Sequence, residues 1–345
     1  MAMKLYQAVP GVFSLETNVS YIPGFQFASH LFPIQTYLKP LFHVRYEVGK
    51  WSINSHQPHF HIAGVNPNTD EVWLHYGNKL VSFSFKSKGL RSDCLEVLVS
   101  KQYALLYRNR IEVLYPPGAY LTDLVTVMLL QRNLSPIHCS CIEIDGKSYL
   151  MTAPAGTGKT LTALRLLQHC PDARIMSDDI VITDGFQVWG CPLTASVEYD
   201  LKELGVKGLS WWHHMLLKLM PLLYPFVVKS IRPLIVQLGE KRISFKAPAG
   251  ALFFLERGSP SWRKIESNDG LRMLIAINRL EFTYMRNVLI SAYSFYDPSF
   301  SLLALSEQEE TILHRLLENV PAYVITSAHP DDFWKVILRI LERHG

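Results

Sequence analysis

Residues 153–160 of the chain, APAGTGKT, combine the residue types that bind phosphate groups. Glycines let the chain turn so that backbone N–H groups face inward, and the lysine and threonine add an ammonium group and a hydroxyl. Ala153 stands where the commonest form of such a phosphate loop has its first glycine. We expect the loop to bind the phosphates of ATP or GTP through Ala155, Gly156, Thr157, Gly158, Lys159 and Thr160, and Thr160 to be a ligand of Mg²⁺.

Two adjacent carboxylates, Asp178 and Asp179, follow a predicted strand at 174–177. At the carboxyl end of a strand the chain leaves the sheet, so both side chains could approach the phosphate loop. One would hold Mg²⁺ and the other would accept a proton from a hydroxyl, and the residues alone leave open which does which. A second acidic pair, Asp331 and Asp332, opens a predicted helix and is typical of helix capping.

The elements that must position these residues follow from the pattern of apolar residues. A strand at 149–152, the loop, a helix at 160–169 and a strand at 174–177 form an α/β unit. We also predict strands at 251–256 and 323–326, and helices at 271–278, 307–319 and 331–343. The first third is strand-rich, with apolar runs at 72–76, 80–85, 95–99 and 103–107, and a helix follows at 120–132. We therefore expect a strand-rich N-terminal domain at 1–118 and a second domain at 119–345.

Composition narrows the class of protein. The 345 residues are 48% hydrophobic and 19% charged, which excludes wholesale disorder, and the net charge of +4 is too small to indicate a nucleic-acid partner. Five cysteines without a CxxC pair favour a reducing compartment, and the first residues lack a signal-peptide pattern, so we expect a cytoplasmic protein. Cys139 and Cys141 lie on one face of a predicted strand and are expected to be structural.

The order of motifs resembles the core of the HPr kinase family, which shares a phosphate-loop fold with PEP carboxykinases. Ile137-His138, a strand, the loop, a helix with Thr-Ala-Leu and a strand ending in Asp-Asp occur here in the family's order, within 137–198. The resemblance implies an α/β nucleotide-binding core of the HPr kinase/PEP carboxykinase type. The strand-rich first third is similar to the layout of these enzymes in outline.

Roles for individual residues are implied by the same resemblance. Lys159 and Thr160 match the nucleotide and metal ligands, Asp178 the catalytic base, and Asp179 its magnesium-linked neighbour. His138 matches the histidine beside the transferred phosphate, although by itself a histidine beginning an apolar strand is typical of a structural residue. Glu198 is loosely similar to a glutamate beside the metal and is a further candidate metal ligand.

The chain also departs from the family. The glycine-rich Leu-Glu-Ile-Arg-Gly-Leu-Gly signature of true HPr kinases is absent after Glu198, so we do not expect HPr as substrate. The late Pro-Gly-Arg-Asn signature is missing too, and Lys241, Arg242 and Lys246 are candidates to stabilise charge on a phosphoryl group. We find no equivalents of the substrate arginines or the extra metal-ligand histidine of PEP carboxykinases.

An apolar stretch near 209–238 follows the predicted catalytic segment. Its prolines and charged residues argue against a membrane-spanning helix. It could pack internally, line a hydrophobic substrate channel, contact a partner or a second copy in a homo-oligomer, or touch a membrane surface.

These observations favour an ATP- or GTP-dependent, Mg²⁺-requiring kinase acting on a hydroxyl. The acceptor would be a peptide serine or threonine, such as that of a ribosomally made natural product, or a small metabolite. The alternatives are a phosphate-loop ATPase and a nucleotide-binding regulator without an acceptor. An apolar strand ending in Asp-Glu well after the lysine, typical of ring-forming ATPases, is absent from the sequence.

Overall fold

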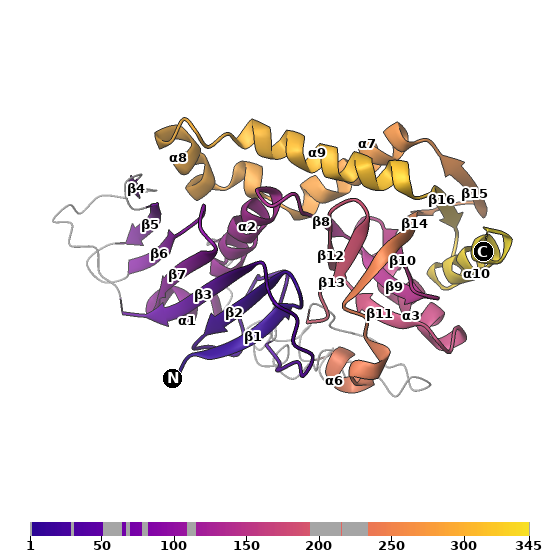
Figure 1. The fold of residues 1–345 in the computed structure, drawn as a ribbon, viewed down its shortest axis with the longest axis horizontal. Coiled ribbons are helices and arrows are strands. Elements are labelled where there is room, and N and C mark those ends of the chain that lie inside the picture. Colours follow the sequence, from indigo (N-terminus) through magenta and orange to yellow (C-terminus); the bar gives the residue numbers. More distant parts are fainter. Residues whose placement is uncertain are drawn as a thin grey trace. The chain divides into compact units, whose positions relative to one another are not determined.

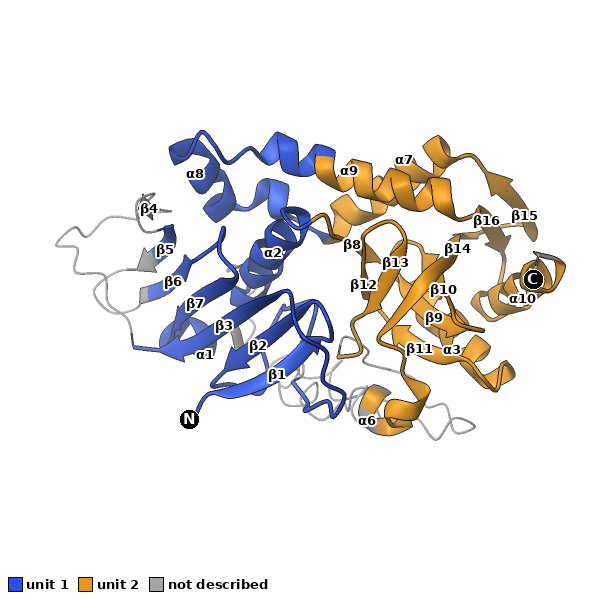
Figure 2. Cartoon of the chain, viewed as in Figure 1, with its two compact units in different colours: residues 1–132, 213–230, 282–307 blue, residues 133–212, 231–281, 308–345 orange. Residues whose placement is uncertain are grey.

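The computed structural model describes residues 2–28, 31–50, 64–66, 70–77, 82–108, 115–193, 215 and 234–344. It divides into two compact units, each assembled from three segments of the chain (Figure 2). Unit 1 consists of Met1–Arg132, His213–Ser230 and Phe282–Glu307, and unit 2 of Asn133–Trp212, Ile231–Glu281 and Gln308–Gly345. Of the apolar stretch near 209–238, only Met215 and α6 (Leu234–Leu238) are among the described residues.

Unit 1 is built on a sheet of seven described strands, in the order β1-β2-β3-β7-β6-β5-β4 (Figure 1). The strands are β1 (Lys4–Val9), β2 (Phe13–Thr17), β3 (Phe42–Gly49), β4 (Gly64–Asn66), β5 (Glu71–Gly77), β6 (Ser82–Lys88) and β7 (Cys94–Ser100). Neighbours in this order pair antiparallel except for β2 with β3 and β3 with β7, which are parallel. The strand-rich character predicted for this part of the chain is confirmed.

The strand prediction at 103–107 is wrong, because this segment belongs to helix α1 (Lys101–Arg108). The hydroxyl of Ser100 accepts a hydrogen bond from the backbone N–H of Tyr103 at 3.3 Å, as an N-cap residue does. A short apolar run does not distinguish a strand from one face of a helix, and here the capping serine decides the outcome.

Helix α2 (Pro117–Leu130) belongs to unit 1, so the compact units do not follow the boundary expected at 118–119. Its buried Asp123 accepts hydrogen bonds from the backbone and hydroxyl of Thr283 and from the amide of Asn287, at 2.8–3.3 Å. Residues 282–307, which include the 3-10 turn η5 (Tyr284–Arg286) and α8 (Val288–Tyr296), thereby return to the first unit. No local sequence pattern predicts that residues so far from α2 in the chain contact it.

Unit 2 contains a sheet of nine described strands. Along the main path the order is β11-β9-β10-β14-β13-β12-β8, and β16 joins β14 to β15. The bounds are β8 (Ser135–His138), β9 (Ser140–Ile144), β10 (Lys147–Thr152), β11 (Arg174–Ser177), β12 (Ile180–Thr183), β13 (Gln187–Gly190), β14 (Lys246–Arg257), β15 (Ser261–Ile265) and β16 (Ala322–Ser327). Strands β10, β14 and β16 are mutually parallel, so their carboxyl ends lie at one edge.

Helices cover both faces of this sheet (Figure 1). Helices α7 (Ser267–Glu281) and α9 (Leu302–Asn319) pack on one face, and α3 (Lys159–His169) lies with α10 (Phe333–His344) on the other. Along β14, Leu252 and Phe254 belong to the core under α7 and α9, while the equally buried Phe253 and Leu255 point to the opposite face. A strand apolar at successive positions is the pattern of a sheet buried on both sides.

The predicted elements around the phosphate loop are confirmed as β10, α3 and β11. The strands predicted at 251–256 and 323–326 are parts of β14 and β16, and the helices predicted at 271–278 and 307–319 are parts of α7 and α9. The helix expected at 331–343 begins as a 3-10 turn, η6 (Pro330–Asp332), and continues as α10. Within the described part of the chain, no helix has the length and apolarity needed to cross a bilayer.

Candidate active site

Four strand ends bring the candidate residues of unit 2 to one edge of the sheet. The phosphate loop follows β10, Arg257 ends β14, and the loop before η6 follows β16. Strand β9 is antiparallel to both β10 and β11, so β11 runs parallel to β10 and delivers Asp178 and Asp179 to the same edge. His138 ends β8 and lies opposite Ile180 of β12, next to the aspartates.

The phosphate loop has the backbone that its glycines permit. Gly156 has a φ of 76° and Gly158 a φ of 123°. A side chain on Gly158 would place its Cβ 2.8 Å from Cβ of Pro330, so only glycine fits between this loop and η6. The N-cap residue of α3 is Gly158, which has no side chain to accept a hydrogen bond, so among the described residues the first N–H groups of the helix can face an anion.

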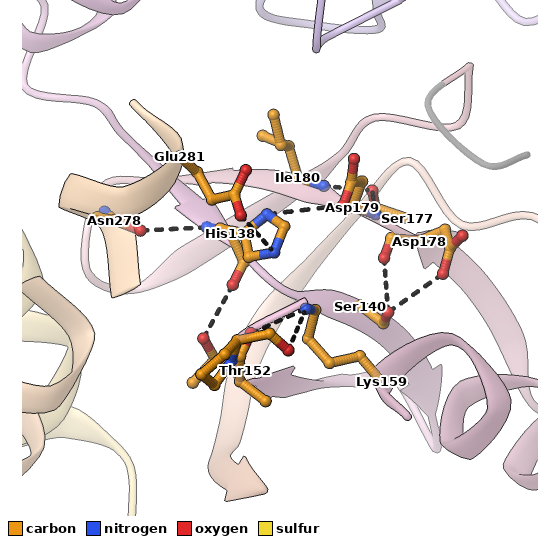
Figure 3. Close-up of polar contacts among 12 residues, drawn as sticks. His138, Ser140, Thr152, Lys159, Ser177, Asp178, Asp179, Ile180, Asn278 and Glu281 are labelled. Atoms are coloured by element: carbon orange, nitrogen blue, oxygen red, sulfur yellow. Dashed lines mark hydrogen bonds and ion pairs between the residues drawn. The ribbon is translucent and has the colours of Figure 1, made fainter. Parts of the chain in front are cut away.

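Lys159 is 7% exposed, and its Nζ donates hydrogen bonds to the carbonyl oxygens of Ala153 at 2.8 Å and Pro154 at 3.4 Å (Figure 3). Burial lowers the pKa of its ammonium group, whereas the carboxylates of Asp179, Glu281 and Asp178 act in the opposite direction. An ammonium group has three N–H donors, so one remains for a ligand.

Asp178 is buried next to the start of α3. Its carboxylate accepts hydrogen bonds from the hydroxyls of Thr160 and, at 3.2 Å, Ser140. Burial raises the pKa of Asp178 to about 6, an effect that the hydrogen bond from Thr160 partly offsets. The bond between Asp178 and Thr160 joins the two oxygen groups expected at a metal.

Asp179 points differently from its neighbour, with 53% of its side chain exposed. Its Oδ1 lies 3.6 Å from Nδ1 of His138, and Oε1 of Glu281 lies 3.6 Å from Nε2 on the other side of the imidazole (Figure 3). Partial desolvation raises the pKa values of both carboxyl groups. Burial, together with the charge of Lys159, lowers the pKa of His138 to about 3, so the imidazole is neutral at physiological pH.

A cavity of about 400 Å³ opens over these groups. Its wall contains the loop and the start of α3, together with His138, Asp179, Arg257 and Pro330. Arg257 donates a hydrogen bond to the carbonyl of Ala328 at 3.2 Å, which ties the guanidinium to the loop after β16. Cationic, carboxylate and backbone N–H groups therefore line the same cavity.

The structure brings together His138, the phosphate loop, Asp178 and Asp179, as the sequence predicts. Glu198 lies outside the described residues. Arg242 donates to the carbonyls of Pro171 and Leu167, both at 2.7 Å, and Lys246 lies over the ring of Trp189. Arg242, Lys246 and Lys241 do not line the cavity, so the structure does not support their predicted role in stabilising a phosphoryl group.

Asp331 and Asp332 act through ion pairs and form no side-chain cap on η6. Asp331 pairs with Arg165 of α3 at 2.7 Å and Asp332 with Lys335 at 2.7 Å. The first pair links η6 to the helix that follows the phosphate loop.

Cys141 of β9 and Cys139, the residue before this strand, form no disulfide and are buried. Burial raises the pKa of each thiol.

Sequence reasoning missed Glu281, Asn278, Ser140 and Arg257. Ser140 and Arg257 each sit at the end of a strand near the loop, a position that could have drawn attention to them. Glu281 and Asn278 lie in the last turn of α7, far along the chain from His138, and no local pattern connects them.

No protein-family model matches the chain, and no curated protein matches it. Among solved structures it is similar to the HPr(Ser) kinase/phosphatase of Coxiella burnetii, with 12% sequence identity and a TM-score of 0.30. The similarity covers 61% of this chain and 95% of that protein. We therefore take the function from the geometry of the site.

Proposed function

We propose that the chain is an ATP- or GTP-dependent kinase of the HPr-kinase-like phosphate-loop type, which transfers the γ-phosphoryl group to a hydroxyl. The supporting observation is that one cavity contains the phosphate loop, Lys159, and the carboxylate of Asp179 beside His138. Transfer of a phosphoryl group to a hydroxyl requires a loop that binds the polyphosphate and a carboxylate near it that can accept the hydroxyl proton.

The residues present fit Mg²⁺. Three carboxylates, those of Asp178, Asp179 and Glu281, act on the single ammonium of Lys159, so a polyphosphate would add to an excess of negative charge. Hydroxyl and carboxylate oxygens are the donors that Mg²⁺ prefers, and one or two protein ligands suffice when phosphates supply the rest. Thr160 and Asp178 would hold the ion, which would supply positive charge to the phosphate oxygens when bound.

This assignment exchanges the roles that the family resemblance implies for the two aspartates. Asp178 is bonded to Thr160 and does not line the cavity, whereas Asp179 does. A base must reach the hydroxyl proton, so the exposed carboxylate of Asp179 suits that role better.

In the proposed reaction, the acceptor oxygen attacks the γ-phosphorus, and the bond from that phosphorus to the β–γ bridging oxygen breaks. The hydroxyl proton passes to Asp179. The N–H groups at the start of α3 and the ammonium of Lys159 orient the phosphates, and most of the rate gain comes from positioning and electrostatics. Acceptors of the proposed class are a peptide serine or threonine, including one in a ribosomally made natural product, or a hydroxylated metabolite.

A hydrolytic function is the second candidate, because Asp179 is exposed enough to orient a water molecule in place of an acceptor. A regulator that binds nucleotide without chemistry is the third. The three functions differ in where the γ-phosphate goes.

The test is incubation with Mg²⁺ and nucleotide labelled in the γ-phosphate, alone and with pools of serine- or threonine-containing peptides and hydroxylated metabolites. We expect label in an acceptor, and loss of that label in K159A and D179N. K147A is the matched control, since Lys147 is an exposed lysine at the opposite end of β10. Acceptor-independent phosphate release would instead support the ATPase, and binding without turnover the regulator.

A further inference from the structure

The last turn of α7 contacts His138 at two points. Oδ1 of Asn278 accepts a hydrogen bond from the backbone N–H of His138 at 3.1 Å, and its Nδ2 donates to the carbonyl of Pro136 at 2.9 Å. Three residues later on the same helix face, Glu281 directs its carboxylate at the imidazole of His138 (Figure 3). One helix end therefore fixes the main chain of β8 and faces the ring that this strand presents.

The helix end is itself held in place. Asn278 is completely buried and also donates to Oε1 of Glu309 at 3.1 Å. Glu309, which is 1% exposed, forms an ion pair with Arg279 at 2.7 Å. These contacts join the last turn of α7 to α9, so the position of Glu281 depends on a rigid, buried network.

The imidazole of His138 lies between two carboxylates. Its side chain is 6% exposed, with Asp179 3.6 Å from Nδ1 and Glu281 3.6 Å from Nε2. Both separations exceed a hydrogen bond, and Nε2 has no hydrogen-bond partner among the described residues. A buried ring nitrogen left without a bond carries a free-energy cost and is more typical of a functional group than of a structural one.

We propose that Glu281 is a positioning residue for His138, with Asn278 fixing the strand end on which His138 stands. The carboxylate of Glu281, 3.6 Å from Nε2, favours the tautomer that has its single proton on Nε2. The Nδ1 lone pair then faces Asp179 and cannot bind its carboxylate, which stays available to the acceptor hydroxyl. Glu281 is not among the residues that line the cavity, so it does not contact the nucleotide, and its effect on the acceptor passes through His138. This inference rests on the proposed kinase function.

The kinetic test uses E281Q and E281A with the acceptor that takes the label in the test above. We expect kcat to fall by about 10- to 100-fold in E281A, the range found when the partner of a metal-bound histidine is removed, with nucleotide binding not weakened and the melting temperature unchanged. D269N is the matched control, because Asp269 is a half-exposed carboxylate in the first turn of the same helix. A proportional loss of nucleotide affinity or of folding in E281A would overturn the proposal.

A double-variant cycle separates action through His138 from direct action. In an H138Q background, we expect E281Q to cause no further loss of kcat, because the group that Glu281 orients is gone. Multiplicative losses in H138Q/E281Q would show that the two side chains act independently and would contradict the proposal.

A readout without turnover keeps this inference separate from the kinase proposal. In protein labelled with ¹⁵N at histidine, the ring signals of His138 are assigned by their loss in H138Q. We expect them to show one neutral tautomer in the wild type and a mixture or a changed tautomer in E281Q, but no change in D269N. Unchanged signals in E281Q would refute the positioning role even if phosphotransfer is confirmed, and a missing acceptor would refute only the kinase.

Discussion

Asp178 and Asp179 are neighbours in the chain, but their carboxylates meet different surroundings. The first is buried and receives hydroxyl hydrogen bonds from Thr160 and Ser140, while the second is half exposed beside His138. The pair could be predicted from sequence because it directly follows the first strand after the phosphate loop and its helix. Their division of roles could not, because it depends on which carboxylate the turn after β11 directs into the cavity.

The acid limb of the pH profile follows from these surroundings. Both carboxyl groups must be ionised, one to accept a proton and one to hold the metal, and burial raises both pKa values, that of Asp178 to about 6. Activity should therefore be fully present above the raised pKa values and be lost as pH falls through them. We expect the acid limb of kcat/KM, measured from pH 4.5 to 8, to lie above the ordinary pKa of an aspartate. An acid limb near 4, the ordinary value of an aspartate, would contradict the buried arrangement.

At the scale of elements, the phosphate loop depends on the loop between β16 and α10. Pro330 packs against Gly158, and Arg165 of α3 pairs with Asp331. The β10–loop–α3–β11 unit could be predicted because each signal is local: apolar runs, glycines and a lysine at fixed spacing. The contribution of η6 and of α7 could not, since it depends on the order of strands in the sheet and on contacts between residues far apart in sequence.

The two loop glycines should respond differently to alanine. At Gly156 a Cβ meets open space, so G156A should cost only the strain of a positive φ, about 1–2 kcal/mol. At Gly158 the φ of 123° is combined with a contact of 2.8 Å to a rigid proline ring. We expect G158A to weaken nucleotide binding at least about 10-fold more than G156A and to lower the melting temperature further. Calorimetric titration and thermal unfolding of both variants provide the check, and equal effects would argue against the packing of Pro330 on the loop.

At the scale of the whole molecule, each of the two compact units is assembled from three separate segments of the chain. Alternating apolar residues could predict the strands of the first unit and the α/β character of the second. They could not predict that 282–307 joins the first unit, because this depends on the buried carboxylate of Asp123 and its partners Thr283 and Asn287. The proposed activity belongs to unit 2, in which all of the described site residues lie.

The most direct test of the nucleotide site is calorimetric titration of the full chain with ATP and with GTP in the presence of Mg²⁺. We predict saturable binding of at least one triphosphate, weakened about 10- to 100-fold in K159A, because a hydrogen bond to a charged group contributes about 1.5–3 kcal/mol. K147A should bind as the wild type does. Absence of binding by the folded wild-type protein, or equal affinity in K159A, would contradict the account.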